Sequence, residues 1–332
     1  MYFINQNDKF LLGKKFIDLF CGIGGFHLAL SSYGAECVFS SEIDEDACDV
    51  YEDNFKIRPS GDIRKITDNE IPAHNILCAG FPCQAFSISG KKDGFNDPNG
   101  KLFFEIIRIA KYHNPEMIFL ENVKNLETHN NGETLKKITS ELNNIGYKSF
   151  SKVLNSTNFE VPQARKRIYI IAFRNDLNIT EFNFPHKKGE IKSLEDILIE
   201  PNHPKYTIKR DYELDLSVEN NIQKSNHLVR VGRIGKGRQG ERIYSTKGQA
   251  ITLSSQGGGL GGKTGMYYIG GKVRKLSPKE CARLMGFPDN YKLSSSDSKS
   301  YKQLGNSVVV NVLQEILSTV SQILYLEGAN HG

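Results

Sequence analysis

A cysteine, a glutamate and two arginines are the residues of this sequence best suited to covalent chemistry. Cys83 follows the apolar run 76–80 through the dipeptide Phe81-Pro82. Proline fixes its own φ and restricts the residue before it, so we expect the thiol on a stiff turn at the carboxyl end of a strand. Open α/β sheets bind their ligands at that edge. A lone cysteine is more often a buried core residue, and the nucleophile interpretation therefore depends on the motifs around it.

Two further motifs contribute charged side chains. Glu121-Asn122-Val123 follows the predicted strand 116–120, and a carboxylate at the end of a buried strand is costly unless it is partnered or functional. Strand alternation would place Gln163, Arg165 and Arg167 on one face of the next strand. A solvated basic edge is the alternative, but two arginines near the carboxylate rim predict an oxygen-rich ligand such as a phosphate or a carbonyl.

The first elements of the chain must hold a nucleotide-like cofactor. A strand over 16–20, a glycine-rich turn over 21–25 and a helix over 26–33 predict a βα nucleotide-binding start. His27 stands where a full GxGxxG motif needs glycine, so a pyrophosphate site is weakly indicated. A second strand over 37–41 delivers Glu42, placed to bind ribose hydroxyls. Asp62 is suited to an adenine amino group, although such a residue is more often a cap.

The remaining elements predict two domains. A long loop over 84–101, a helix over 102–112 and a strand over 168–173 extend an open, doubly wound α/β sheet. Residues 196–277 are polar and glycine-rich, and between Lys224 and Lys247 seven basic residues face the single acid Glu241. This stretch predicts an irregular β-rich domain that grips nucleic acid. Residues 1–195 plus 278–332, which end in an amphipathic helix over 308–326, form the predicted catalytic domain.

Composition limits the class of protein. The 332 residues carry a net charge of +5, and no apolar run approaches the roughly 20 residues that cross a bilayer. The polar N-terminus lacks a secretory signal, so we expect a cytoplasmic protein without a membrane partner. The six cysteines form no CxxC motif and no Cys/His cluster with metal-ligand spacing, so we expect no structural metal.

Six motifs in a fixed order resemble the cytosine-5 DNA methyltransferases. They are FxGxGG at 20–25, the acid Glu42, GFPCQ at 80–84, ENV at 121–123, QxRxR at 163–167 and GNSV at 305–308, with a variable basic segment before the last. Each motif alone is weak, but together they cover nearly the whole chain. The resemblance implies the Rossmann-like fold of S-adenosylmethionine-dependent methyltransferases, and it makes Cys83 the expected nucleophile.

The resemblance also implies roles for the charged residues. Cys83 would add to C6 of a cytosine so that C5 can attack the methyl group of S-adenosylmethionine. Glu121 would form a hydrogen bond with N3 and protonate it, provided that apolar surroundings raise the pKa of Glu121. Arg165 would polarise the cytosine O2, with Arg167 as a further catalytic residue. The sequence does not show which base removes the C5 proton.

Binding residues follow from the same resemblance. The expected cofactor-binding residues are Phe20, Gly22, Gly24, Gly25, Glu42, Ile43, Asp62, Ile63, Gly80, Pro82, Leu102, Asn306 and Val308. The target base must be flipped out of the duplex, and Gln239 and Ser89 would then fill the vacated space. Arg242 would read a guanine, and Ser87 also belongs to the expected DNA-binding residues.

Three positions depart from a GCGC-specific relative, and these departures concern binding rather than catalysis. Ile43 replaces a tryptophan beside the cofactor, Arg238 replaces a glycine and Gln256 replaces a tyrosine. The expected target is nonetheless GCGC in duplex DNA. We expect the protein to act as a monomer and to protect this site from a cognate restriction endonuclease. No stable complex between the two proteins is expected. A transfer-RNA cytosine-5 methyltransferase, a nicotinamide-dependent oxidoreductase and a DNA-binding protein without activity remain as alternatives.

Overall fold

The chain forms two compact units in the computed structural model. The model describes residues 9–81, 101–186, 189–190, 192–199 and 203–328, and side chains up to residue 323. The large unit comprises residues 1–154, 166–185 and 313–332, and the small unit comprises 155–165 and 186–312. The predicted sites at Pro82, Cys83, Ser87 and Ser89 lie outside the described residues.

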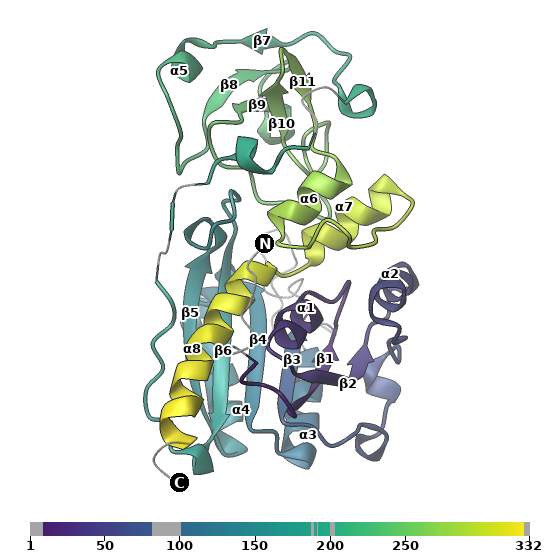
Figure 1. The fold of residues 1–332 in the computed structure, drawn as a ribbon, viewed down its shortest axis with the longest axis vertical. Helices are drawn as coiled ribbons and strands as arrows, with labels where there is room; N and C mark the ends of the chain where they lie inside the picture. The colour runs from purple at the N-terminus through teal and green to yellow at the C-terminus, as the bar shows by residue number, and fades with distance from the viewer. Residues whose placement is uncertain (1–8, 82–100, 187–188, 191, 200–202, 329–332) are drawn as a thin grey trace. The chain divides into compact units, whose positions relative to one another are not determined.

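A six-stranded sheet with the order β2-β1-β3-β4-β6-β5 forms the centre of the large unit (Figure 1). The first four strands in this order are parallel, whereas β6 pairs antiparallel with β4. The order reverses beside β1, which makes the sheet doubly wound and confirms the predicted fold class. The strands are β1 (Lys15–Leu19), β2 (Glu36–Ser41), β3 (Ile76–Gly80), β4 (Met117–Val123), β5 (Tyr147–Asn155) and β6 (Lys166–Arg174).

Helices cover both faces of this sheet. One face carries α3 (Leu102–His113) and α4 (Glu133–Asn144), whose buried residues join one hydrophobic cluster with the strands. The other face carries α1 (Gly25–Ser32) and α8 (Val310–Gly328), and α8 crosses the sheet in front of β4 and β6 in Figure 1. A hydrogen bond of 2.8 Å from Tyr33 Oη to Gln314 O joins these two helices. α2 (Glu45–Phe55) follows β2.

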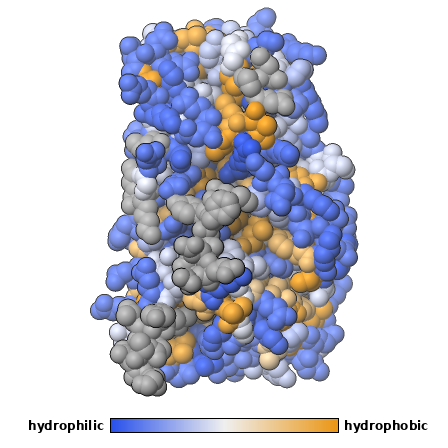
Figure 2. All heavy atoms as spheres, viewed as in Figure 1, coloured by the Kyte–Doolittle hydropathy of each residue, from blue (hydrophilic) through white to orange (hydrophobic). Residues whose placement is uncertain are grey.

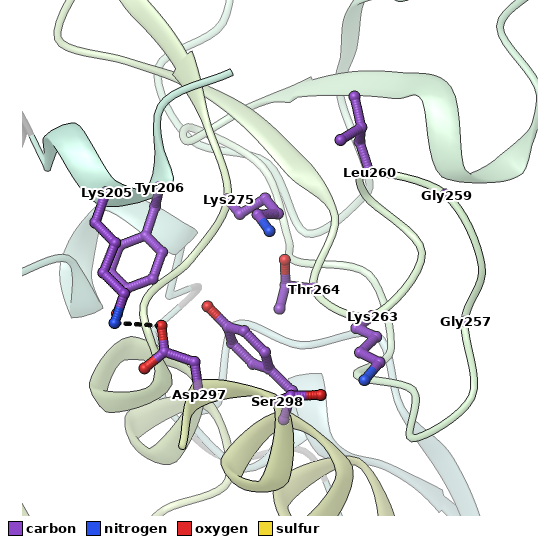
Figure 3. A pocket seen from close by; sticks show the side chains of 11 residues that line it. Lys205, Tyr206, Gly257, Gly259, Leu260, Lys263, Thr264, Lys275, Asp297 and Ser298 are labelled. Carbon is purple, nitrogen blue, oxygen red and sulfur yellow. Dashed lines mark ion pairs between the residues drawn. The ribbon is translucent and has the colours of Figure 1, made fainter. Parts of the chain in front are cut away.

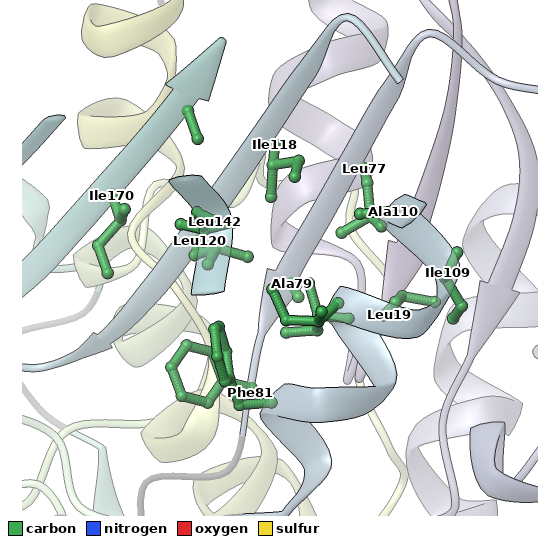
Figure 4. Close-up of a cluster of buried hydrophobic side chains, with 14 of the residues drawn as sticks. Leu19, Leu77, Ala79, Phe81, Ile109, Ala110, Ile118, Leu120, Leu142 and Ile170 are labelled. Carbon is green, nitrogen blue, oxygen red and sulfur yellow. The ribbon is translucent and has the colours of Figure 1, made fainter. Parts of the chain in front are cut away.

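The core below α3 and α4 fixes the sheet that carries the predicted site. Leu77, Ala79, Ile118 and Leu120 of β3 and β4 are fully buried and point toward these helices (Figure 4). Truncating one such side chain to alanine typically costs about 2–5 kcal/mol, because the cavity is only partly refilled. The residues that follow β3 and β4 therefore start from a rigid base.

The small unit is built from short strands around a smaller core. Its five-stranded sheet has the order β11-β10-β9-β8-β7. Val231, Ile243, Met266 and Val273 form the centre of its hydrophobic cluster. The elements are β7 (Glu213–Leu214), α5 (Ser217–Asn220), β8 (Arg230–Arg233), β9 (Arg242–Ser245), β10 (Met266–Ile269), β11 (Lys272–Arg274), α6 (Pro278–Leu284) and α7 (Asp297–Asn306).

The start of α6 follows the predicted capping box. Ser277 Oγ accepts the Glu280 N–H at 3.3 Å, and Glu280 accepts the Ser277 N–H at 2.8 Å. The same carboxylate is paired with Arg274 at 2.8 Å, and both side chains are at most 2% exposed. The pair ties β11 to α6 within the small unit.

One expectation about the last part of the chain differs from the structure, and another is not tested by it. Gly305-Asn306-Ser307 ends α7 rather than opening the final helix, which begins at Val310. Residues 278–312 and 155–165 also group with the small unit, whereas the predicted recognition domain spans 196–277. That functional division stays a prediction, because compactness does not identify the residues that bind DNA.

Hydrophilic residues cover most of the described surface on the face drawn in Figure 2, and hydrophobic residues appear there in separate patches. Ile43 and Leu12 are among the exposed large hydrophobic residues, at 68% and 74% exposure. Among the described residues, every helix is too short or too polar to cross a membrane.

Candidate active site

Strand register places Gly80, the first residue of the GFPCQ motif, beside Glu121 of the ENV motif. Gly80, the last residue of β3, pairs with Glu121 of β4 in the parallel ladder. Asn122 Nδ2 donates to the Phe81 carbonyl at 3.1 Å, which fixes the chain as it leaves β3. The strand that leads to Cys83 therefore ends beside the carboxylate, as the sequence predicted from the rule for parallel strand ends.

Arg167 is the partner of that carboxylate. Its Nε lies 3.2 Å from Glu121 Oε1, and their side chains are 17% and 10% exposed. Antiparallel pairing of β6 with β4 sets Arg167 opposite Val123, two residues beyond the glutamate. A fixed positive charge therefore stands next to the predicted acid in a mostly buried position.

Arg165 does not share a strand face with Arg167, so the predicted alternation is wrong. β6 begins at Lys166, and the residues before it belong to the small unit. Arg165 is 2% exposed, and its guanidinium donates to the carbonyls of Leu253, Gly305 and Ser307 at 3.2, 3.1 and 2.7 Å. These bonds hold Arg165 beside the segment that carries Asn306 and Val308.

Gln163 is likewise held by main-chain groups rather than in a strand. Its Nε2 donates to Leu284 O at 2.8 Å, and its Oε1 accepts the Leu253 N–H at 3.0 Å. Of the two predicted cofactor residues after α7 begins, Asn306 is exposed at the end of that helix, whereas Val308 is buried. Both predicted cofactor residues lie in the small unit.

The glycine turn after β1 has the open geometry that the sequence predicted. Phe20, Gly22 and Gly24 have φ values of 55°, 53° and 80°. A Cβ at Gly22 would meet no atom within 4 Å, whereas one at Gly24 would lie 2.2 Å from the Phe55 ring. Gly24 thus permits close packing of the turn on α2, whereas the space next to Gly22 is open.

Glu42 is tied to that turn by main-chain hydrogen bonds. Its Oε2 accepts the Gly22 N–H at 2.9 Å, and its Oε1 accepts the amides of Ile43 and Asp44 at 2.8 and 2.9 Å. The carboxylate is therefore oriented before any ligand binds. Ile43 projects beside it with 68% exposure and offers an apolar surface.

Asp62 has a partner that the sequence analysis missed. Arg64 donates to both carboxylate oxygens, from Nε at 2.9 Å and from Nη2 at 2.7 Å. This bond is the main reason why the pKa of Asp62 lies below its ordinary value. Asp62 also caps the 3-10 turn Ile63–Lys65, in which Ile63 is buried. Leu102, the remaining predicted residue of this group, is partly exposed at the start of α3.

A buried polar cluster lies behind the glycine turn. His27 Nδ1 is 2.7 Å from Tyr51 Oη, and its ring stacks on Phe55 with centroids 3.8 Å apart. Burial lowers the pKa of His27 to about 4. The sequence had shown His27 only as a break in a glycine motif. Tyr51 and Phe55 stand four residues apart in α2, a spacing that could have indicated a shared face.

Two of the predicted DNA-reading residues are exposed in the small unit. Gln239 belongs to the 3-10 turn Gln239–Glu241, and Arg242 opens β9. Arg238 is the N-cap residue of this turn and forms a capping box with Glu241, whose Oε2 accepts the Arg238 N–H at 2.9 Å. Within the described residues, no group of three metal-ligating side chains comes together.

Comparison with known proteins identifies the family. The model of the C-5 cytosine-specific DNA methylases matches residues 14–322. The chain belongs to this family. It is 51% identical to the type II methyltransferase M.HhaI of Haemophilus parahaemolyticus over 97% of this chain and 98% of that protein. It is 40% identical to M.HpaII of Haemophilus parainfluenzae, over 93% of this chain and 88% of that one.

Two solved structures share the fold of this chain. Dnmt2 of S. pombe has a TM-score of 0.69 at 24% identity and covers 94% of this chain and 99% of its own. The EhMeth protein of Entamoeba histolytica has a TM-score of 0.74 at 20% identity, over 94% and 98% of the two chains. The predicted family and activity are thus confirmed: the protein is a DNA (cytosine-5-)-methyltransferase of the type II restriction–modification class. The match decides against an oxidoreductase.

Proposed function

We propose that Cys83 attacks a cytosine flipped out of duplex DNA and that Glu121 assists this attack. The register that pairs Gly80 with Glu121 carries the proposal, because it brings the strand leading to Cys83 beside a buried carboxylate. The ion pair between Arg167 and Glu121 supports a defined orientation of that carboxylate. Extruding the base costs roughly a few kcal/mol, which DNA contacts must offset.

The chemistry divides among few groups. The Cys83 thiolate forms a bond to C6 of the cytosine, Glu121 donates a proton toward N3, and the resulting enamine is nucleophilic at C5. Arg165 polarises O2 of the base in this scheme, and Arg167 orients Glu121. C5 would then take the methyl group, with S-adenosylhomocysteine as the leaving product. Loss of the C5 proton to a base expels the thiolate, Glu121 takes back the N3 proton, and the aromatic ring is restored with its new methyl group.

The methyl donor in this proposal is S-adenosylmethionine, which supplies an electrophilic methyl group on a sulfonium. Glu42 fits its ribose hydroxyls, because main-chain amides hold the carboxylate beside the open space at Gly22. Asp62 fits the adenine amino group, and the exposed Ile43 offers a face for the adenine ring. The remaining members of the proposed pocket are Phe20, Gly24, Gly25, Ile63, Gly80, Pro82, Leu102, Asn306 and Val308.

DNA reading is proposed for the exposed residues of the small unit. Gln239 would occupy the space left by the flipped base together with Ser89, Ser87 would contact the DNA beside it, and Arg242 would read a guanine. We infer GCGC as the target from the likeness to M.HhaI. Arg238 stands next to Gln239, so any change of specificity is expected at the base pairs near these two residues.

The biological setting follows from the same class. We infer that the enzyme works as a cytoplasmic monomer and protects DNA from a cognate restriction endonuclease without forming a stable complex with it. One molecule suffices to modify one flipped base.

Labelled S-adenosylmethionine offered with unmethylated plasmid DNA and total transfer RNA tests this function. Label should enter DNA alone, and bisulfite sequencing should find it at GCGC. Label in transfer RNA would contradict the proposed substrate, and methylation at another sequence would contradict the proposed target.

A duplex that carries 5-fluorocytosine at the target tests Cys83 directly. Fluorine cannot leave as the proton does, so the covalent complex should persist in denaturing gels. Cys83→Ala should abolish this adduct and reduce methylation by about 10⁴-fold or more. Cys78→Ala is the matched control, because Cys78 is a fully buried thiol of β3 and should retain the adduct. An adduct in Cys83→Ala would refute the assignment.

A further inference from the structure

The small unit contains a pocket that none of the proposed roles uses. Its volume is about 430 Å³, and all its lining residues belong to this unit. One wall is the glycine-rich loop 257–262, and another is the start of α7 (Figure 3). The side chains of Lys275 and Thr264 extend into the same central space in this view.

Its lining carries an excess of positive charge. Lys205, Lys263 and Lys275 face a single acid, Asp297, which leaves a net charge of 3 − 1 = +2. Asp297 is paired with Lys205 at 2.7 Å. In the described part of the chain, Lys263 and Lys275 have no acid within ion-pair distance. Two ammonium groups are thus available for an anion.

The glycine-rich loop connects this pocket with the proposed DNA-reading segment. Gly261 N donates to Gly240 O at 2.9 Å, and a Cβ at Gly240 would lie 2.6 Å from Gly258 O. Gly240 stands between Gln239 and Arg242 in the sequence. The main chains of the two segments are therefore in direct contact, which places the glycine-rich wall of the pocket beside the proposed DNA-reading segment.

We propose that the pocket binds a backbone phosphate of the DNA outside the recognised base pairs, with Lys263 and Lys275 as its cationic ligands. This inference rests on the proposed DNA reading by the small unit. Lysine suits the role because an ammonium acts as a point charge on phosphate and reads no base. The contact adds affinity and register but no sequence preference.

The salt dependence of DNA binding tests this site. Loss of the whole phosphate contact should reduce the slope of log K against log salt concentration by about 0.9, and each single lysine variant should lose part of this. Lys263→Ala and Lys275→Ala should each weaken binding several-fold at about 0.1 M salt, equally for duplexes with and without the target. Lys275→Arg should preserve the wild-type slope, because it keeps the charge.

Lys272→Ala is the matched control, since Lys272 is an exposed lysine of β11 that does not line the pocket. It should retain the wild-type slope. A slope that is unchanged in the two pocket variants, or reduced equally in Lys272→Ala, would overturn the proposal. Thermal unfolding of each variant shows whether the fold is kept.

Two further measurements distinguish a contact with the DNA backbone from a site for a small anion. Titration with inorganic phosphate should give binding in the millimolar range or weaker, whereas tight binding of free phosphate, lost in Lys275→Ala, would make the pocket a small-anion site instead. Methylation at saturating DNA and affinity for S-adenosylmethionine should stay unchanged in both lysine variants. Absence of DNA methylation by the wild-type protein would refute the proposed function. A salt-dependence slope that is unchanged in the lysine variants would refute only the phosphate site.

Discussion

The large and small units hold their functional residues by different means. In the large unit Glu121 stands at the end of a buried parallel strand, and Glu42 is bonded by three main-chain amides. In the small unit Gln239 and Arg242 are exposed on a single turn and at the start of a four-residue strand. The comparison indicates that Glu121 and Glu42, whose proposed roles tolerate little displacement, are held by the sheet and by main-chain bonds, whereas Gln239 and Arg242 lie on a surface that can change without loss of the core.

Among the predictions that test this comparison, replacing Glu121 by glutamine should give the largest effect, a loss of methylation activity. The amide cannot protonate N3, so we expect methylation to fall by about 10²–10³-fold with little change in DNA affinity. Single-turnover methylation and gel-shift titration measure the two quantities. Glu116→Gln is the control, because Glu116 lies at the other end of β4 and pairs with Lys14. Equal losses in both variants would contradict a catalytic role.

Core truncation in each unit tests whether the two functions separate. Leu120→Ala and Ile243→Ala remove fully buried side chains, and each should cost about 2–5 kcal/mol of unfolding free energy. At a temperature where both variants remain folded, Leu120→Ala should weaken S-adenosylmethionine binding, whereas Ile243→Ala should mainly weaken DNA binding. Denaturant titration and calorimetry of each ligand check this. Identical losses of both ligands would show that the units do not act separately.

The cluster at His27 makes the large unit sensitive to acid. Burial lowers the pKa of His27 from 6.5 to about 4, so the unfolded chain takes up a proton at higher pH than the folded protein. Stability should therefore be lost as the pH falls from about 6.5 to about 4, by roughly 3 kcal/mol for this group.

His27→Gln should remove that contribution and flatten the pH dependence of the unfolding free energy. His74 provides the comparison, because burial lowers its pKa to about 4 as well. His74→Gln should flatten the curve in the same window without affecting S-adenosylmethionine binding. An unchanged curve in His27→Gln would mean that the pKa of His27 is the same in the folded and the unfolded protein.

Arg64→Ala should give the smallest change. Without its two bonds to Asp62 the carboxylate is less well oriented, and we expect S-adenosylmethionine affinity to fall about threefold with kcat unchanged, since the exposed Arg64 leaves the pair open to solvent screening. Arg58→Ala is the control, because Arg58 pairs with Glu45 and Asp49 of α2 instead. A donor in which oxygen replaces the adenine amino group should bind wild type and Arg64→Ala alike.

The sequence predicted the strand ends of the large unit well, because buried parallel strands are continuous apolar runs and their polar successors stand out. It predicted β1, β3 and β6 and the neighbouring position of Gly80 and Glu121. It missed α2, whose stretch is rich in acids and whose start depends on the Asp44 cap.

The environment of Arg165 and the lysine pocket could not be read from the sequence. The hydrogen-bond partners of Arg165 are main-chain carbonyls of residues about 90 to 140 positions away, and a carbonyl has no signature in the residue type. Lys205, Lys263 and Lys275 are likewise far apart in the chain and converge only through folding. Long-range contacts of this kind require the tertiary structure.

The small unit is assembled from two stretches of chain, 155–165 and 186–312, so the polypeptide passes between the units four times. Deleting 186–312 would leave Arg165 and Gln163 without the carbonyls and amides that now surround them. Residues 186–312 therefore cannot be removed without disturbing Arg165 and Gln163. Engineering a new target site should graft loops such as 235–240 or 256–262 onto an intact scaffold rather than exchange the whole small unit.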